Sequence, residues 1–163
     1  MNAQLHEAYI GLGSNLEPRE EHISAAIDGL RALGDVVKVS SIRNTAPVGY
    51  KEQPEFLNAV LLLSTTLSPL RLLSEMRALE KRLGRKERPR WHEREIDLDL
   101  LFWDDFVLNV EEITLPHPEI RRRKFVLEPL AEIAPNFVHP VLGQTIQQLL
   151  EEFEHEAQPS DRK

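Results

Sequence analysis

The first forty residues carry apolar patterns of two different kinds. A short, continuous apolar run over residues 8–12 predicts a buried strand, and two turn-forming residues, Ser14 and Asn15, follow it. Apolar residues then recur at steps of three and four over residues 23–33, with acidic residues ahead of them and Gly34 behind. The pattern predicts a strand, a tight turn that caps a helix, and the helix itself.

Two more strands and a loop follow. The β-branched stretch 36–42 and the apolar stretch 56–66 are typical of strands. Residues 44–55 between them contain two prolines and a glycine, which interrupt helices and strands and so disfavour regular structure. We therefore expect a long loop there, of a length that often serves function.

A second helix and a fourth strand complete the regular part of the chain. Ser68 and Pro69 form a helix cap and first turn, apolar residues repeat at helical spacing after them, and Gly84 ends the pattern. Residues 95–103 then alternate, so that Asp97 and Asp99 face one side of a strand and the apolar residues between them face the other.

This order of elements predicts an α+β fold. Strand, helix, strand, strand, helix, strand is the split βαβ pattern of a ferredoxin-like βαββαβ core, with an antiparallel sheet backed by helices. The residues after Trp103 are predicted to be appended C-terminal elements: a turn at 104–105, an edge strand at 113–115, a break at Pro116 and Pro118, and helices over 125–133 and 145–153. We expect one domain over residues 1–163, with a disordered tail from about residue 155.

The composition is that of an ordinary globular protein. Hydrophobic residues make up 41% of the 163 residues and charged residues 29%, and there is no cysteine. The absence of cysteine excludes disulfides, zinc-thiolate sites and cysteine nucleophiles. The longest wholly apolar run, residues 59–63, is far short of the roughly 20 residues that span a bilayer. We expect a cytoplasmic monomer with no membrane partner.

The charge is acidic overall and basic locally. A net charge of -7 argues against a nucleic-acid partner, because affinity for phosphate backbones depends on accumulated Lys and Arg. Seven cations nevertheless lie between Lys81 and Arg94, and four more lie over residues 121–124. Two such clusters suit a small polyanion such as a nucleoside triphosphate, although a solvated charged loop is the commoner origin of any single one.

The paired acids are the sharpest chemical feature. Residues two apart on a strand face the same side, so Asp97 and Asp99 bring two repelling carboxylates together. Two hard oxygen ligands without a thiolate favour Mg²⁺. The alternative is an exposed strand face on which nearby arginines neutralise the acids.

Other motifs admit two interpretations each. The GLGSN segment at residues 11–15 lacks the third glycine of a dinucleotide site and the lysine of a P-loop, so a tight turn is favoured. Trp91 either stacks on a base or pins the basic loop, and His92 and His117 are weak metal candidates. Phe56 with Asn58, and Phe125 beside a basic cluster, form an aromatic pocket with an amide or simply pack in the core.

Together these stretches resemble the 6-hydroxymethyl-7,8-dihydropterin pyrophosphokinase family of folate biosynthesis, over residues 9 to about 150. The resemblance rests on YIGLGSN at 9–15, NTAPVG at 44–49, QPEFLN at 53–58, LEKRLGR at 79–85, RWHEREIDLDLL at 90–101, LPHP at 115–118 and RKFVLEPL at 123–130. This chain departs from the usual pattern at several positions, among them Glu95, where threonine is frequent.

The resemblance implies a reaction and a set of site residues. The reaction is transfer of the pyrophosphoryl group of ATP to the hydroxymethyl oxygen of the dihydropterin, with release of AMP and with two Mg²⁺ ions. In the family pattern Asp97 and Asp99 hold both metals, Arg94 clamps phosphate oxygens, and Arg85 acts from a mobile loop with Lys86 or Arg88. Other positions that match ATP-binding ones are Glu80, Trp91, Leu100, Thr114, His117 and Arg123. The pterin stacks between Phe56 and Phe125, with its edges met by Asn58, Thr45, Ala46, Pro47 and Val48.

Two functions of other kinds compete with this one. A noncatalytic nucleotide- or RNA-binding module can have the same fold, but it requires strand aromatics where this chain has paired acids. A magnesium-dependent kinase that transfers one phosphate is the second rival. It differs from a pyrophosphokinase in releasing ADP instead of AMP.

Overall fold

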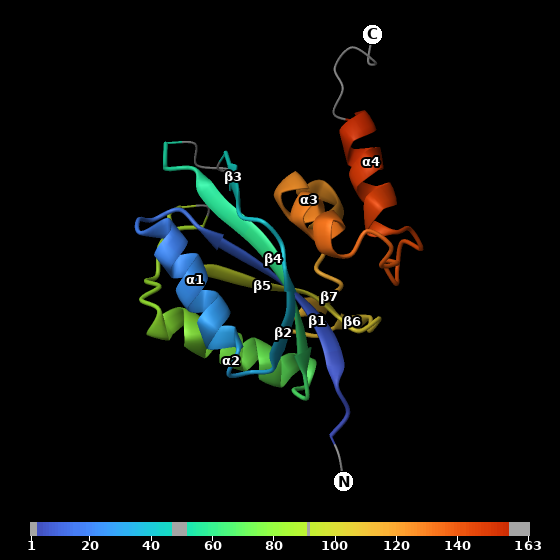
Figure 1. Ribbon diagram of the computed structural model, residues 1–163, viewed down its shortest axis with the longest axis horizontal. Helices are drawn as coiled ribbons and strands as arrows, with labels where there is room; N and C mark the ends of the chain where they lie inside the picture. The colour runs from blue at the N-terminus through green and yellow to red at the C-terminus, as the bar shows by residue number, and fades with distance from the viewer. Residues whose placement is uncertain (1–2, 47–51, 91, 157–163) are drawn as a thin grey trace.

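An antiparallel sheet of five strands forms the frame of the molecule. The structure is a computed structural model that describes residues 3–46, 52–90 and 92–156. The strands are β1 (His6–Ser14), β2 (Asp35–Val39), β3 (Arg43–Thr45), β4 (Phe56–Thr65) and β5 (Asp97–Trp103). Their order is β2-β4-β1-β5, and β3 pairs with the first residues of β4 (Figure 1).

Two helices cover one face of this sheet. They are α1 (Arg19–Leu30), between β1 and β2, and α2 (Pro69–Arg82), between β4 and β5. The Ser68 hydroxyl caps α2 by accepting a hydrogen bond from the Arg71 amide at 3.3 Å, and Gly84 follows the helix with φ at 95°. Strand order and helix positions confirm the predicted ferredoxin-like α+β fold, and α2 begins and ends where the sequence indicated.

The residues after Trp103 cover the other face. They form the hairpin β6 (Leu108–Asn109) and β7 (Thr114–Leu115), a short 3₁₀ turn (Ile120–Arg122), and helices α3 (Lys124–Ile133) and α4 (Ile146–Glu156). Figure 1 places α3 and α4 on the side of the sheet away from α1 and α2. The edge strand and both helices were predicted, although α4 runs through residues 155 and 156, where a disordered tail was expected to begin.

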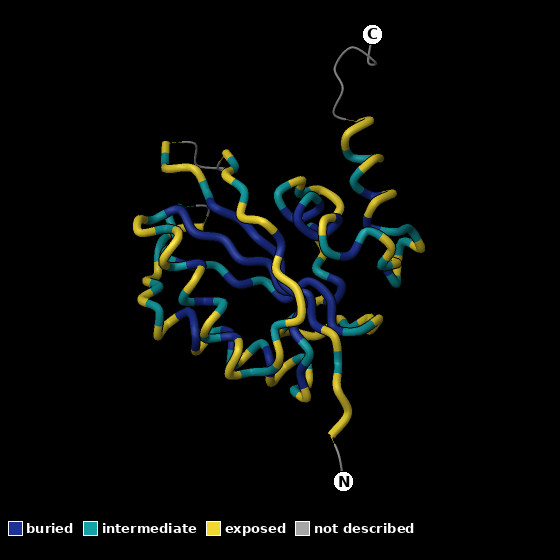
Figure 2. The backbone as a smooth tube through the Cα atoms, in the orientation of Figure 1, coloured by how far each residue is buried: buried dark blue, intermediate teal, exposed yellow. Residues whose placement is uncertain are grey.

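A β-bulge sorts the side chains of β5 between two apolar cores. The register with β1 shifts between Tyr9 and Ile10, so Leu101 and Phe102 both pack on the α3 side while Leu100 packs on the α1–α2 side. The central strands are buried and β2 is largely exposed (Figure 2). Ahead of the bulge the predicted alternation holds, which leaves Asp97 and Asp99 on the α3 side.

Several local predictions were wrong. The GLGSN segment makes no tight turn, because β1 continues to Ser14, and α1 begins only at Arg19 with Pro18 as its N-cap residue. The first helix ends at Leu30, short of the predicted residue 33. The predicted loop at 44–55 contains part of β3, in which Thr45 pairs with Phe56.

Gly34 is required by a close approach and does not cap the helix. A Cβ atom built at Gly34 falls 2.2 Å from the carbonyl oxygen of Ser64, in the strand that pairs with β2. The neighbouring Leu33 carbonyl accepts a hydrogen bond from the Thr65 hydroxyl at 2.7 Å, which holds the two chain segments together. Only a residue without a side chain fits there.

We expect Gly34→Ala to lower the free energy of unfolding by about 2 kcal/mol or more, since the clash is with backbone and no side-chain rotation relieves it. Urea denaturation followed by circular dichroism measures this. Gly143→Ala is the matched control, because Gly143 has φ at 69° but open space around it and pays only the conformational cost of about 1–2 kcal/mol. A Gly34→Ala protein as stable as the native one contradicts the packing described.

Candidate active site

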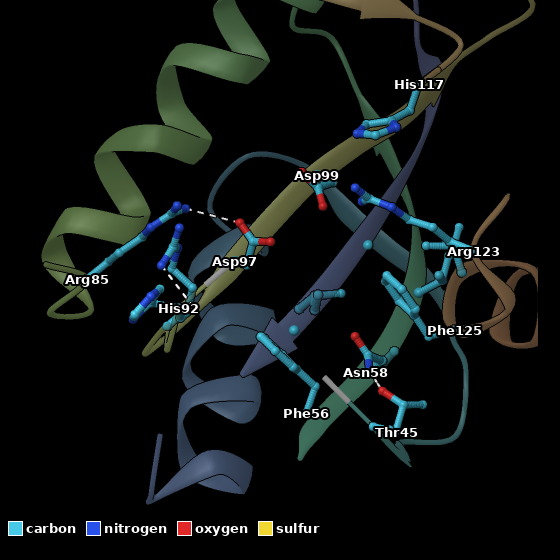
Figure 3. A pocket seen from close by; sticks show the side chains of 18 of the residues that line it. Thr45, Phe56, Asn58, Arg85, His92, Asp97, Asp99, His117, Arg123 and Phe125 are labelled. Carbon is cyan, nitrogen blue, oxygen red and sulfur yellow. Dashed lines mark hydrogen bonds and ion pairs between the residues drawn. The ribbon is translucent and has the colours of Figure 1, made fainter. Parts of the chain in front are cut away.

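A cavity lies on the α3 side of the sheet and brings together most of the predicted site residues. Strands β1, β4 and β5 form its floor, and the start of α3 and the loop after α2 form its walls (Figure 3). The predicted residues that line it are Thr45, Ala46, Phe56, Asn58, Arg85, Arg94, Asp97, Asp99, His117, Arg123 and Phe125. Acidic and cationic groups lie at one end, and the two phenylalanines lie at the other.

Two glycines make the floor of the cavity flat. In the sheet register Gly13 stands between Asn58 and Asp97, and Gly11 stands between Val60 and Asp99. A Cβ atom at Gly13 meets Asn58 Oδ1 at 3.2 Å, so any side chain there crowds the amide. Sequence reasoning missed both residues. The available signal was a pair of glycines two apart inside an apolar strand, which marks close approach by a ligand or another backbone.

At the acidic end of the cavity, Asp97 has an arginine partner, whereas the pKa of Asp99 is raised. Arg85 Nη1 donates to Asp97 Oδ1 at 3.1 Å, which neutralises part of that carboxylate. For Asp99, burial and then the charge of Asp97 raise the pKa of the carboxyl to about 7, against the opposing effect of Arg123. A cation placed between the two acids relieves both effects.

The donor set fits a hard divalent cation such as Mg²⁺. The described residues contain no cluster of three or more His, Cys, Asp or Glu side chains around a common point. Two carboxylates on one strand face are therefore the protein ligands on offer, and Mg²⁺ in nucleotide sites commonly takes one or two carboxylates and completes its octahedron with phosphate oxygens and water.

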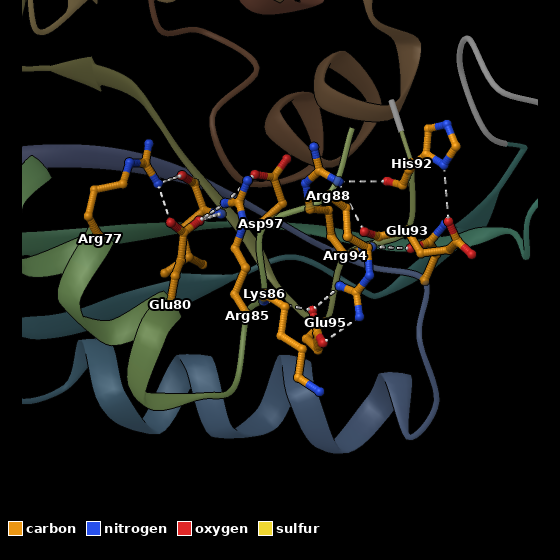
Figure 4. A network of polar contacts seen from close by, with 12 residues as sticks. Arg77, Glu80, Arg85, Lys86, Arg88, His92, Glu93, Arg94, Glu95 and Asp97 are labelled. Atoms are coloured by element: carbon orange, nitrogen blue, oxygen red, sulfur yellow. Dashed lines mark hydrogen bonds and ion pairs between the residues drawn. The ribbon is translucent and has the colours of Figure 1, made fainter. Parts of the chain in front are cut away.

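Glu80 positions this end of the site from below and does not line the cavity. Its carboxylate is 3% exposed and accepts hydrogen bonds from Arg77 Nη1 and Arg85 Nη1, both at 2.7 Å, and from the Leu98 amide at 2.8 Å (Figure 4). Leu98 lies between the two aspartates on β5. Glu80 thus fixes Arg85 relative to the strand that carries the acids.

His117 presents a neutral ring with a defined tautomer. Its Nδ1 accepts a hydrogen bond from the Glu119 amide at 3.1 Å, so the ring proton resides on Nε2. Burial, and then the nearby Arg123 guanidinium, lower the pKa of the imidazole. His117 is therefore a neutral hydrogen-bond donor at the cavity wall.

The other end of the cavity is aromatic with one polar group at its base. Phe56 and Phe125 lie on two sides of it with Asn58 between them (Figure 3). Asn58 is 6% exposed and donates through Nδ2 to the Thr45 hydroxyl, which orients the amide. Arg123 lies 5.6 Å from the Phe125 ring centre and so joins the aromatic and cationic parts of the site. A flat, polar-edged ring matches this end.

Asn15 ties the two ends together from behind. Its side chain is fully buried, and Nδ2 donates to Gln53 Oε1 at 2.7 Å and to the Pro54 carbonyl at 3.1 Å. Its side-chain Oδ1 accepts a hydrogen bond from the Arg94 backbone amide at 2.8 Å. The Asn15 backbone amide donates to the Arg94 carbonyl at 3.1 Å. The predicted role of Asn15 in a turn or helix cap was wrong; it joins the segment before Phe56 to the segment before Asp97.

The basic loop, residues 85–95, is held by its own internal contacts in the part that the structure describes. Arg94 Nη1 donates to the carbonyls of His92 and Glu93, both at 3.0 Å. Arg88 donates to both oxygens of Glu95, and this contact lowers the pKa of the Glu95 carboxyl to about 2. Besides Arg94, the loop residues Arg90 and His92 line the cavity.

Several predicted ATP-binding residues lie off the cavity. Leu100 is 2% exposed in the apolar core on the α1–α2 side, and Thr114 is exposed on β7, where its hydroxyl bonds to Asn109. Glu80, Lys86 and Arg88 are likewise absent from the lining. The predicted site residues Pro47, Val48 and Trp91 lie outside the described residues.

The comparisons with known proteins agree with one another. The model of the family described as 7,8-dihydro-6-hydroxymethylpterin-pyrophosphokinase (HPPK) matches residues 9–135. A 2-amino-4-hydroxy-6-hydroxymethyldihydropteridine pyrophosphokinase of Haemophilus influenzae is 40% identical over 148 residues, covering 90% of this chain and 92% of that one. The Aquifex aeolicus protein of the same name is 39% identical over 140 residues, covering 86% and 88%.

Solved structures support the fold. A crystal structure of Plasmodium falciparum HPPK-DHPS aligns with a TM-score of 0.79 and 16% identity, covering 98% of this chain and 45% of that one. This chain thus spans less than half of the Plasmodium protein. At that identity the likeness concerns the fold alone, but the family match and the bacterial relatives cover most of the sequence: this chain belongs to the 7,8-dihydro-6-hydroxymethylpterin-pyrophosphokinase family.

Proposed function

We propose that this protein transfers the pyrophosphoryl group of ATP to 6-hydroxymethyl-7,8-dihydropterin, giving the pterin diphosphate and AMP, as a step of folate biosynthesis. The observation that carries the proposal is the two-ended cavity, in which paired acids and arginines adjoin an aromatic slot with an amide at its base. Family membership supports the same reaction.

Asp97 and Asp99 are proposed to hold two Mg²⁺ ions together with the phosphates of ATP. When bound, magnesium neutralises charge on the transferred group and polarises its oxygens. Support comes from the position of both carboxylates on one face of β5 and from the raised pKa of Asp99, which burial and then the charge of Asp97 cause. Of the two acids, Asp97 is also oriented by Arg85.

The cationic wall is proposed to bind the triphosphate. Arg85, Arg94 and Arg123 line the cavity near the acids, and guanidinium groups bind phosphate oxygens in a fixed geometry. Neutral His117 donates a hydrogen bond through Nε2–H to a phosphate oxygen without adding positive charge to the site. Positioning of the reacting groups in line, together with electrostatic stabilisation of the transferred group, accounts for most of the catalysis in phosphoryl transfer.

The aromatic end is proposed to bind the pterin. A flat bicyclic ring fits between Phe56 and Phe125, and the Asn58 amide offers a donor and an acceptor to the ring edge. Asn58 pairs with Gly13, and Gly13 pairs with Asp97 across the next strand. The ring is thus held within reach of the phosphates that the acids collect.

The direct test is to incubate the protein with ATP, Mg²⁺ and 6-hydroxymethyl-7,8-dihydropterin and to separate the nucleotides by chromatography. We expect AMP that forms only when the pterin is present. ADP as the product assigns the site to a kinase that transfers one phosphate. Absence of both, in protein that is folded by circular dichroism, rejects the enzyme and favours a nucleotide-binding module.

The acids can be tested singly. Asp97→Asn and Asp99→Asn are each expected to reduce kcat at least about a hundredfold, because the metal contributes several kcal/mol to stabilising the transition state. Their melting temperatures are expected not to fall, since each change removes one of two like charges. Asp105→Asn, on an exposed turn, is the control. Full activity in either active-site variant refutes the metal role.

The protonation of His117 can be followed by long-range ¹H–¹⁵N NMR on metal-free protein in EDTA. We expect the Nε2–H tautomer and a pKa below the ordinary 6.5. Arg123→Gln raises that pKa only in part, because burial is the larger cause, while Arg123→Lys keeps the charge and leaves it low.

The sign of the accompanying stability change follows from the same shift. The unfolded chain takes up this proton more readily, so the contribution of His117 to stability is complete above pH 6.5 and declines as the pH falls below that value. A ring that titrates at or above 6.5, or that carries its proton on Nδ1, contradicts the described geometry.

A further inference from the structure

Arg88 and Glu95 form a two-point contact within the basic loop. Arg88 Nη1 and Nη2 lie 2.6 Å and 2.9 Å from the two oxygens of Glu95 (Figure 4). The Lys86 amide adds a third donor at 3.3 Å. The side chains are 26% and 12% exposed, so the pair is largely removed from water. Parallel hydrogen bonds of this kind fix both the distance and the orientation of the partners.

We propose that Arg88 is a positioning residue: through Glu95 it holds the basic loop in the shape that presents Arg90, His92 and Arg94 to the cavity, and it does not itself bind phosphate. The inference rests on the proposed function, because the ligand concerned is the triphosphate of ATP. It assigns Arg88 a different role from the one that family resemblance implies.

The Arg88–Glu95 pair is anchored at the start of β5. Glu95 precedes Ile96, which is fully buried, and β5 begins at Asp97. The carboxylate is therefore attached to the rigid end of the loop, whereas Arg88 lies in the middle of it. A bidentate contact between a rigid end and a middle residue closes the loop on itself.

The closed loop turns a defined set of side chains toward the cavity. Arg90, His92 and Arg94 line it, and Arg88 does not. Inside the closed segment the His92 amide donates to the Pro89 carbonyl at 3.1 Å, and Arg94 bonds to carbonyls of the same turn. Arg88 and Arg94 thus hold the turn at its two ends, and Arg90 lies between them and lines the cavity.

Electrostatics also keep Arg88 on Glu95. If Arg88 left Glu95 for a phosphate, it would leave a largely desolvated carboxylate unpaired, two residues from Asp97 and beside an incoming polyanion. Unpaired buried charge is costly, and like charges near the metal-binding acids add to that cost.

Charge reversal distinguishes a strut, which here means an Arg88–Glu95 pair that holds the loop in shape, from an Arg88 that binds phosphate. We would compare the native chain with Arg88→Glu, Glu95→Arg and the double variant that carries both changes. We expect each single change to raise KM for ATP about tenfold or more, and the double variant to return within about threefold of native, because it rebuilds the pair with its charges exchanged. A double variant as impaired as Arg88→Glu shows that Arg88 acts on ATP directly and overturns the proposal.

Glu95→Gln supplies a second distinction. A strut that loses its charge loosens the loop, so we expect KM for ATP to rise. If Glu95 only competes with ATP for Arg88, KM falls instead, and the proposal is wrong. The matched control is the reversal of Arg71 and Glu75, a pair on α2 at 3.4 Å whose side chains are 66% and 33% exposed, which is expected to leave all kinetic constants unchanged.

Hydrogen exchange gives a readout that needs no turnover. In the ligand-free single variants, amides of residues 86–90 and 92–94 are expected to exchange about tenfold faster than in the native chain, and in the double variant at nearly the native rate. Unchanged exchange in both single variants refutes the strut whatever the enzyme does. Altered exchange in a chain that makes no AMP leaves the strut standing and removes only the proposed reaction.

Discussion

The position of β1 between β4 and β5 is the constraint on which the site depends. Because all three strands are antiparallel neighbours, Gly13 fixes Asn58 on one side and Asp97 on the other, two strand spacings apart, or about 10 Å. That distance separates the proposed ring site from the proposed phosphate site. The absence of side chains at Gly11 and Gly13 keeps the space between the two proposed sites open. The strand spacing thus sets the separation of the two sites, and the sheet forms the floor of the cavity.

One face of this sheet is fully packed, and the other is partly uncovered. The α1–α2 face is packed into a continuous apolar core that includes Ile10, Leu98 and Leu100. The α3 face is packed only over part of its length, and the uncovered part is the cavity. The appended C-terminal elements both close the second core and contribute His117, Arg123 and Phe125 to the site. A ferredoxin-like core alone has the acids but lacks one aromatic wall.

The sequence was enough to predict the elements and the chemistry of individual residues, because both depend on local patterns. Alternation placed Asp97 and Asp99 on one face, and Ser68 with Gly84 marked the ends of α2. What could not be predicted depends on contacts between distant segments. The role of Asn15 is set by Gln53 and Arg94, and that of Gly34 by Ser64; nothing within a few residues of either reveals its partner.

The same distinction explains the site residues that resemblance alone could not resolve. A motif assigns residue types to positions, but it does not say which of several loop cations reaches the cavity. Glu80 matches an ATP-binding position, yet in the structure it is a buried acceptor that orients Arg85. Leu100 matches another, yet its side chain packs in the core. Resemblance implies a role for each of these positions, whereas the contacts describe what each side chain touches.

Asn15 also sets a rule for how the two loops can respond to ligands. Gln53 and Pro54 on one side and Arg94 on the other share one fully buried amide, so neither segment can move away without stranding polar groups that water cannot reach. Coupling of this kind is reciprocal by thermodynamic necessity. Anything that displaces the segment before Phe56 therefore also acts on the segment before Asp97, and the converse holds equally.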